Sequence, residues 1–493
     1  MKSGSLVLRS IVAILLLIGF YVLALGIAAG LLWLVYAQIF LAHHVIVKLV
    51  LVCLALAGMI LWSVVPRPDH FEPPGPRLSE QEHPRLFEQI RDVARRTEQA
   101  MPSEVYLVPD VNAFVTQRGG MMGFFSRRVM GIGLPLLSLL TVSELRGVLA
   151  HEFGHYHGGD TKLGPWIYKT RGAIQRTVVS LAQGGSTLVR KPFEWYGALF
   201  LRITQAISRT QELSADALAA RVIGAQPLIR GLKAVHGGSA AFDAYLRQEV
   251  VPVLQAGFRP PLAEGFRTFM DGKRVKASLE KLLSQELAEA EHDPFDTHPP
   301  LARRIEALEA LESGPGESDD RPAVELLEDS DATEAQLIRS NGDKPLEPLA
   351  WSKVTRRVYL PSWQKNADSV VAELGQSATL AELVQSKQAL GALAARLLKE
   401  DLRELGEAAP QIGANFMAAS VCVTLANAGW QVKNSVGRPI VLRDGEKRLT
   451  PFTDFGELAT GKLSAEELSK RLRDAGVAEL IVHTQKSERQ PSA

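Results

Sequence analysis

The residues best suited to chemistry are two histidines and a glutamate in the run His151-Glu152-Phe153-Gly154-His155. On a helix, residues four apart lie one turn apart on the same face, so the two imidazoles could bind one Zn²⁺ ion. Glu152 would lie beside them and could accept a proton from a zinc-activated water. Because the chain has 11 histidines, this spacing can also arise by chance, and the alternative is an ordinary polar turn of helix.

A third protein ligand would separate these alternatives. One class of zinc proteases has a third histidine at the position that is Thr161 here. An acidic residue on a second helix is the other solution, and Glu212 offers one. Asp216 follows one turn later on the same face and could orient a histidine through its second ring nitrogen. Taken alone, this acidic pair is equally typical of a solvated helix face.

The candidate residues belong to a longer pattern, which begins with two uncharged amino-terminal segments. In chain order, the pattern then contains Asn112-Ala113-Phe114, His151-Glu152-x-x-His155, Arg209-x-x-Glu212-x-x-Ala215-Asp216, and Thr297-His298-Pro299-Pro300 with Arg304. Over about residues 80–310 this arrangement resembles the membrane-integrated gluzincin metalloproteases, which include the HtpX heat-shock proteases and the CAAX prenyl endopeptidases. The joint occurrence of the segments in this order is far more specific than any one of them.

The resemblance implies one zinc ion per chain, bound by His151, His155 and Glu212, with Glu152 as the general base. It places Asp216 and Arg209 around these ligands as supporting residues. Three protein ligands with an open fourth position are typical of a catalytic zinc site and not of a structural one.

The resemblance also assigns roles to residues outside the zinc motifs. His298 could donate to the tetrahedral oxyanion, and Arg304 could brace the carboxylates. The alternative for this pair is a helix that begins at two prolines and has an inward-facing arginine. Asn112, Ala113 and Phe114 resemble the edge strand along which these enzymes bind an extended peptide.

The amino-terminal segments predict a membrane hairpin with helices over about 11–37 and 45–65. Each is long enough to cross the ~30 Å hydrocarbon layer. The alternative is a signal peptide followed by a buried helix. Basic residues flank the hairpin and are scarce in its loop, which predicts that both ends are cytoplasmic: Lys2, Arg9, Arg67, Arg77 and Arg85 flank it, and the loop has only Lys48.

The chain divides by composition into a transmembrane hairpin at 1–66, a zinc metallopeptidase domain at 67–310, an acidic linker at 311–345 and a C-terminal α+β domain at 346–493. Nine acidic residues against one basic residue in 311–334 predict that the linker is solvated. Residues 163–207 are amphipathic and basic. We expect them to form helices on the catalytic core, with an added membrane-surface contact as the alternative.

The predicted fold is mainly α-helical, of the α+β type: a gluzincin-type helical domain with a small sheet, and a separate C-terminal domain. Periodicity predicts strands at 104–108 and 129–134, and a helix break near Leu140 followed by a capping box of Thr141 and Glu144. In the last domain we expect strands over 430–436 and 439–449, with a turn at Asp444-Gly445, and a helix capped by Ser464.

A net charge of +1 argues against a nucleic-acid binder, and two cysteines exclude a disulfide framework and a cysteine-based zinc cluster. The predicted function is that of a membrane-anchored zinc endopeptidase acting on polypeptides, membrane proteins among them, in quality control or processing. The alternatives are a weak or inactive scaffold that recruits an unknown partner through the C-terminal domain, and a non-proteolytic zinc hydrolase.

Overall fold

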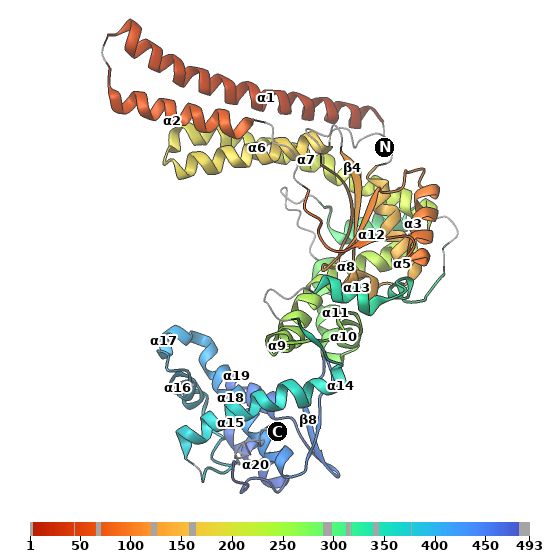
Figure 1. Cartoon of the computed structure of the whole chain (residues 1–493), viewed down its shortest axis with the longest axis vertical. Helices are drawn as coiled ribbons and strands as arrows, with labels where there is room; N and C mark the ends of the chain where they lie inside the picture. The colour runs from red at the N-terminus through yellow and green to blue at the C-terminus, as the bar shows by residue number, and fades with distance from the viewer. Residues whose placement is uncertain are drawn as a thin grey trace. The chain divides into compact units, whose positions relative to one another are not determined.

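The computed structural model describes residues 3–482 except 44, 66–70, 120–125, 157–163, 289–297, 312–315, 317, 339–344 and 376. The chain forms two compact units (Figure 1). The first comprises Met1–Ala240 and Glu280–Leu337, and the second comprises Ala241–Leu279 and Ile338–Ala493. Each unit is described by itself.

The first unit begins with a helical hairpin formed by α1 (Ser3–Tyr36), its continuation η1 (Ala37–Leu41), and α2 (Val47–Val64). Many large apolar side chains on these helices are exposed, for example Leu15 at 62% and Trp62 at 71%. Among the described residues, three helical segments are long and apolar enough to cross a membrane, and two of them are Ile11–Leu41 and Val47–Val64. Exposed apolar surface on this scale is typical of helices that contact lipid.

Helices α6 (Gly164–Gln183) and α7 (Thr187–Val222) pack against this hairpin (Figure 1). Their shared core contains Phe20 of α1, Ile60 of α2, Ile174 of α6, and Phe193 and Phe200 of α7. The sequence predicted that residues 163–207 pack on the catalytic core; the described helices in this range lie against the amino-terminal hairpin instead. Helical periodicity identifies an apolar face but not the partner that covers it.

Four strands form the sheet of the first unit, in the order β1 (Arg77–Leu78), β2 (Glu104–Val108), β4 (Arg127–Gly133), β3 (Ala113–Arg118). The strands predicted at 104–108 and 129–134 are confirmed as β2 and β4. Strand β3 lies at the edge and pairs antiparallel with β4, with Phe114 opposite Gly131. Among the described residues, no strand pairs with the other side of β3.

Helices α3 (Pro84–Arg96), α4 (Leu134–Leu139) and α5 (Val142–Gly154) complete this part of the unit. The predicted break and capping box are confirmed: α4 ends before Leu140, and the Thr141 side chain accepts from the Glu144 N–H while Glu144 accepts from the Thr141 N–H. These bonds satisfy two of the backbone donors that the start of a helix leaves unpaired. They fix where α5, the helix with the histidine motif, begins.

The acidic segment differs from the prediction of a solvated linker. Its described residues 319–337, here called the strap, contain η4 (Ala323–Leu326) and α13 (Ser330–Leu337). The Val142 N–H donates to the Arg321 carbonyl and the Ala323 N–H donates to the Leu140 carbonyl, both at 2.9 Å. Ala323, Val324, Leu326 and Leu327 are buried. The composition averaged over the segment hid these apolar residues, which bind the strap to the start of α5.

The second unit has a helical core and two small sheets. Its elements are the end of α8 (Ala225–Tyr245), η3 (Leu246–Val250), α9 (Val251–Gln255), β5 (Phe258–Arg259), α10 (Leu262–Met270), the start of α11 (Lys273–Ala288), β6 (Glu347–Pro348), α14 (Trp351–Val354), η5 (Thr355–Tyr359), α15 (Leu360–Leu374), α16 (Lys387–Leu398), α17 (Leu402–Leu405), η6 (Gly406–Ala408), α18 (Ala409–Asn427), β7 (Gln431–Lys433), β8 (Val441–Asp444), β9 (Lys447–Leu449), α19 (Pro451–Thr460) and α20 (Ala465–Asp474). The predicted C-terminal strands and the helix capped by Ser464 are confirmed, and the turn predicted at Asp444-Gly445 lies one residue later, at Gly445 and Glu446, because Asp444 pairs with Lys447.

The third apolar segment, Leu402–Asn427, contains helix α18. Its side chains Met417, Val421, Cys422 and Leu425 are fully buried among the neighbouring helices of the second unit. Within this segment 67% of the most apolar window is buried, against 22% for Ile11–Leu41. A helix that is apolar on all sides and covered by protein is typical of a domain core.

Candidate active site

Helices α5 and α7 bring the predicted metal ligands together. His151 and Glu152 lie in the last turn of α5, and His155 is its C-terminal capping residue. Gly154 permits the close approach of α7, since a Cβ atom at this position would lie 2.8 Å from the Cα of Ala215. This contact places Glu212, which is 4% exposed, opposite the two histidines.

His151, His155 and Glu212 each direct one ligand atom to a common point, and these atoms lie within 4.8 Å of one another. His151 Nε2 is 3.5 Å from Glu212 Oε2, and His155 Nε2 is 3.5 Å from Glu212 Oε1. These separations are long for hydrogen bonds. They match the spacing between ligand atoms around a tetrahedral zinc ion bound at ~2.0–2.1 Å.

A buried oxygen supports the same fit. Among the described residues, Glu212 Oε2 has no well-formed hydrogen bond. Its contacts are 3.2 Å to His298 Nδ1 and 3.5 Å to His151 Nε2 and to Arg304 Nη1. Buried carboxylate oxygens without a partner are costly, so a cation is the expected complement. The donor set of two imidazoles and one carboxylate is one that Zn²⁺ accepts.

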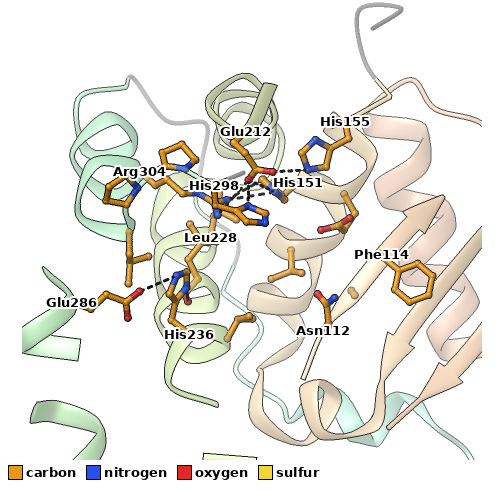
Figure 2. Close-up of a pocket in the computed structure, with 18 residues that line it drawn as sticks. Asn112, Phe114, His151, His155, Glu212, Leu228, His236, Glu286, His298 and Arg304 are labelled. Atoms are coloured by element: carbon orange, nitrogen blue, oxygen red, sulfur yellow. Dashed lines mark hydrogen bonds and ion pairs between the residues drawn. The ribbon is translucent and has the colours of Figure 1, made fainter. Parts of the chain in front are cut away.

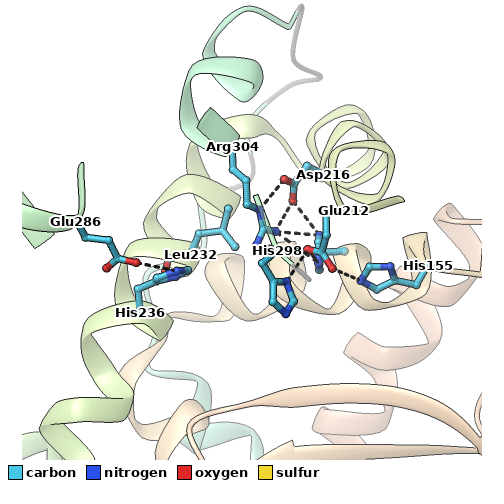
Figure 3. A network of polar contacts seen from close by, with 9 residues as sticks. His155, Glu212, Asp216, Leu232, His236, Glu286, His298 and Arg304 are labelled. Atoms are coloured by element: carbon cyan, nitrogen blue, oxygen red, sulfur yellow. Dashed lines mark hydrogen bonds and ion pairs between the residues drawn. The ribbon is translucent and has the colours of Figure 1, made fainter. Parts of the chain in front are cut away.

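Asp216, which Arg304 contacts (Figure 3), orients His151. His151 Nδ1 lies 2.8 Å from Asp216 Oδ1, which leaves Nε2 directed at the common point. The Arg304 guanidinium, on α12 (Leu301–Glu309), donates two hydrogen bonds to Asp216, at 2.8 Å from Nε and 2.7 Å from Nη2. The Asp216 and Arg304 side chains are almost fully buried, so they hold His151 rigidly.

His298 lies beside Glu212 in the site (Figure 2). It precedes α12, and its side chain is 59% exposed while its Nδ1 is 3.2 Å from Glu212 Oε2. Arg209 is half-buried on α7 and is not among the described residues that line the cavity at this site.

Burial and neighbouring charges shift the pKa values of Glu152, His155 and His151. Burial raises the pKa of Glu152 to about 7, while the His151 charge and a hydrogen bond from the Val115 backbone lower it. Burial, together with the positive charge of His151, lowers the pKa of His155 to about 4. His155 is therefore neutral at pH 7, which is the form that binds a metal. For His151, burial lowers the pKa, but hydrogen bonds to Asp216 and Glu212 raise it to about 9.

The predicted substrate residues lie at the start of β3. Asn112 accepts from the Gly133 N–H at 2.8 Å, so the alternation of an antiparallel ladder turns the backbone groups of Ala113 and Val115 away from β4. Phe114 lies over Gly131, where a Cβ atom would come 2.4 Å from its ring. The open edge at Ala113 faces the cavity that the metal-site residues line.

Tyr156 is a residue that the sequence did not indicate. Its hydroxyl donates to the Val115 carbonyl at 2.9 Å, and Val115 also hydrogen-bonds Glu152 through its backbone. The outward carbonyl and N–H of Val115 are thus hydrogen-bonded to Tyr156 and Glu152, respectively. This arrangement fixes Glu152 against the edge strand.

The cavity has a volume of about 450 Å³ and extends past the metal site to a wall that the sequence also did not indicate (Figure 2). Leu228, Leu232, Val235 and His236 of α8 and Glu286 of α11 form this wall. Their spacing on α8 is that of an ordinary apolar helix face, which does not distinguish a cavity wall from a core.

Comparison with known proteins places this site in a family. Residues 80–312 match the model of peptidase family M48. The chain is 27% identical over 249 residues to a protease HtpX homolog of Arthrobacter sp. (strain FB24), covering 48% of this chain and 76% of the relative. It is 27% identical over 244 residues to protease HtpX of Idiomarina loihiensis, covering 45% and 71%. No solved structure gives a significant match.

The match spans β2, β3, β4, α5, α7 and α12, and it ends before the strap and the α+β region. The apolar hairpin precedes it. Residues 80–312 therefore form a peptidase family M48 domain similar to that of the HtpX proteases, which identifies the chain as a metalloendopeptidase.

Proposed function

We propose that His151, His155 and Glu212 bind one zinc ion and that Glu152 is the general base of peptide hydrolysis. The observation that carries the proposal is the convergence of these three ligand atoms beside a carboxylate held against an open edge strand. When bound, zinc supplies a water of lowered pKa and polarises the substrate carbonyl.

Residues of the chain would bind the substrate, transfer the proton and stabilise the oxyanion. An extended peptide pairs with the outward N–H and C=O of Ala113, which places its backbone across the site. Glu152 accepts a proton from the attacking water and returns it to the leaving nitrogen. Asp216 and Arg304 hold His151 in one tautomer and one orientation. His298 donates to the oxyanion that forms at the scissile carbonyl.

Metal removal tests the proposal directly. The purified full chain in detergent is expected to contain one zinc per chain, to cleave casein, and to lose that activity to a chelator and regain it with zinc. Elemental analysis and a casein assay measure these properties. Metal-free protein with full activity would contradict the proposal.

The proposed role of His298 predicts a separable defect. His298→Ala is expected to lower kcat by ~10²-fold, because an oxyanion donor acts in the transition state. Zinc affinity should stay unchanged, because the side chain is exposed and stands outside the ligand set. Steady-state kinetics and a chelator titration measure the two effects. If this variant loses zinc as readily as Glu212→Ala, His298 is a ligand.

For the membrane arrangement we propose two spans, at Ile11–Leu41 and Val47–Val64, with both ends cytoplasmic. Since α18 is buried in the second unit, it does not supply a third. A reporter fused after Ala493 should be active only in its cytoplasmic form, and one inserted at His43 only in its external form. Digestion of the catalytic domain by protease outside intact cells would overturn this topology.

The biological role that we propose is quality control or processing of membrane proteins, with the C-terminal domain recruiting a partner. The inactive-scaffold alternative is not favoured, because the ligand set and Glu152 are both present. Proteomics of membrane fractions from cells with the wild-type chain or Glu152→Gln would identify substrates as proteins that accumulate only with the variant.

A further inference from the structure

Helices α6 and α7 form a hairpin whose tip, residues 177–191, lies beside the amino-terminal hairpin. Helix α6 packs on α2, and α7 packs on α1 (Figure 1). Near the end of α2, the Ser63 hydroxyl is 2.7 Å from the Thr177 hydroxyl. Farther along, just after the end of α6, a Cβ atom on Gly184 would lie 3.3 Å from the Met59 side chain. The tip therefore passes the end of α2 and continues along the side of that helix.

The α7 arm of this tip is held to α1. The Tyr196 hydroxyl donates to the Leu16 carbonyl. The rings of Phe193 and Phe20 have centroids 6.4 Å apart, and both side chains are fully buried. Since Phe20 belongs to the apolar segment Ile11–Leu41, the first turns of α7 lie beside a helix that is long and apolar enough to cross a membrane.

The contacts with α2 give the depth that the tip reaches. Ser63 is followed by one more residue of α2, Val64, so its level marks one end of that apolar segment. Met59 lies four residues inside this end, about 6 Å along the helix axis, and Gly184 lies seven residues beyond Thr177, about 10 Å along α6. Interfacial segments are buried about 5–10 Å into the boundary between headgroups and acyl chains. The tip reaches that depth and not the centre of a bilayer.

The charges of the sequence fit this depth. Residues 177–189 contain no Asp, Glu, Lys or Arg, and they are preceded by Arg176 and followed by Arg190 and Lys191. The Arg190 side chain forms an ion pair with Glu194 at 2.8 Å, one turn farther from the end of the hairpin. An uncharged segment between basic residues is suited to the upper acyl region, because long basic side chains keep their charge among the headgroups.

The apolar side chains of the α6–α7 hairpin are exposed near its tip. Leu188 is 85% exposed and Val179 is 47% exposed, and Trp195 on the next turns of α7 is 69% exposed. Tryptophan is enriched where a membrane meets water. These side chains stand on helices that pack directly on α1 and α2, so lipid that covers the amino-terminal hairpin is also adjacent to them.

We propose, on the basis of the two membrane spans proposed above, that the tip enters the bilayer leaflet on the side of the catalytic domain and is covered by lipid. The hairpin does not cross the bilayer: α6 enters the upper acyl region and α7 leaves it. The bilayer thus holds the first turns of α7, and the proposed zinc ligand Glu212 lies farther along the same helix.

Spin labels at single cysteines test where the tip lies. The full chain is reconstituted in lipid nanodiscs with its two cysteines, Cys53 and Cys422, replaced by alanine, and a nitroxide is attached at Leu188→Cys. Collisions of this nitroxide with oxygen, which concentrates in lipid, should exceed its collisions with a water-soluble nickel complex several-fold. Arg221→Cys, exposed at the other end of α7, is the matched control and should show the reverse preference.

A label on α2 separates this inference from the proposed spans. Val52→Cys, at a position that is 50% exposed, should prefer oxygen if α2 crosses the membrane. If Val52→Cys prefers nickel, the two-span arrangement fails, and the proposal for the tip is still decided by the label at Leu188. If Val52→Cys prefers oxygen and Leu188→Cys prefers nickel, the spans stand and the tip lies in water, which overturns the proposal.

Two further outcomes are also decisive. Few collisions with either reagent at Leu188→Cys would show that protein, such as a second copy of the chain, covers the tip, and this result overturns the proposal. If Leu188→Cys does not fold or reconstitute, Val179→Cys on the α6 arm takes its place, with the same oxygen preference expected.

Discussion

Glu152→Gln is expected to lower kcat/KM by ~10²–10⁴-fold, because it removes the only group proposed to accept the proton of the attacking water. Zinc should remain at one per chain, because Glu152 is not one of the three ligands. The unfolding temperature should not fall. Burial raises the pKa of Glu152, so its carboxylate form is less stable in the folded protein than in water, and an amide carries no such cost. Kinetics, elemental analysis and thermal unfolding measure these three properties.

Glu88→Gln is the matched control, since Glu88 is exposed on α3 and its replacement removes one negative charge away from the cavity. It should have wild-type kinetics. Normal casein cleavage by Glu152→Gln would show that another group is the base.

Glu212→Ala is expected to abolish both zinc binding and activity. It leaves two imidazoles, and it leaves Arg304 and His298 without the carboxylate that their side chains contact at 3.5 and 3.2 Å. The loss of zinc affinity should exceed the ~10–100-fold typical of residues that only support a ligand. A titration with a chromogenic chelator measures the affinity, and circular dichroism checks that the variant folds. Glu212→Gln, which keeps the shape of the side chain, should have a zinc affinity between those of Glu212→Ala and the wild type.

Asp216→Asn provides the comparison one helical turn away. It keeps the size of the side chain but removes the charge that His151 and Arg304 contact, so zinc should bind ~10–100-fold more weakly and not be lost. If Asp216→Asn loses zinc as completely as Glu212→Ala, the proposal that Glu212 is a ligand and that Asp216 only orients His151 is wrong.

Local patterns predicted the parts of the molecule that depend on neighbours in sequence. The capping box at Thr141 predicted the start of α5, and the spacing of His151 and His155 placed two imidazoles on one side of that helix. The turn at Gly445, where φ is 55°, is equally local. Each of these features follows from bonds or geometry within a few residues.

Other features depend on contacts between distant segments, which a single sequence does not show. Tyr156 was not predicted because its role depends on Val115, forty-one residues away. The apolar face of α8 was not predicted as a cavity wall, because the same spacing describes a core helix. The strap was predicted to be solvated because the average charge of the segment concealed four apolar residues that are buried where η4 packs against α4.

Helix α7 is one continuous helix of 36 residues that holds Phe193 and Phe200 against the amino-terminal hairpin and Glu212 in the site. At 1.5 Å per residue, about 29 Å separates Phe193 from Glu212 along it. A shortened protein without the hairpin would therefore expose two aromatic rings to water and leave the first half of this helix without its packing partners. A soluble peptidase fragment cannot be prepared by removing residues 1–66 alone. The helix surface that the hairpin covered would also have to be redesigned with polar residues.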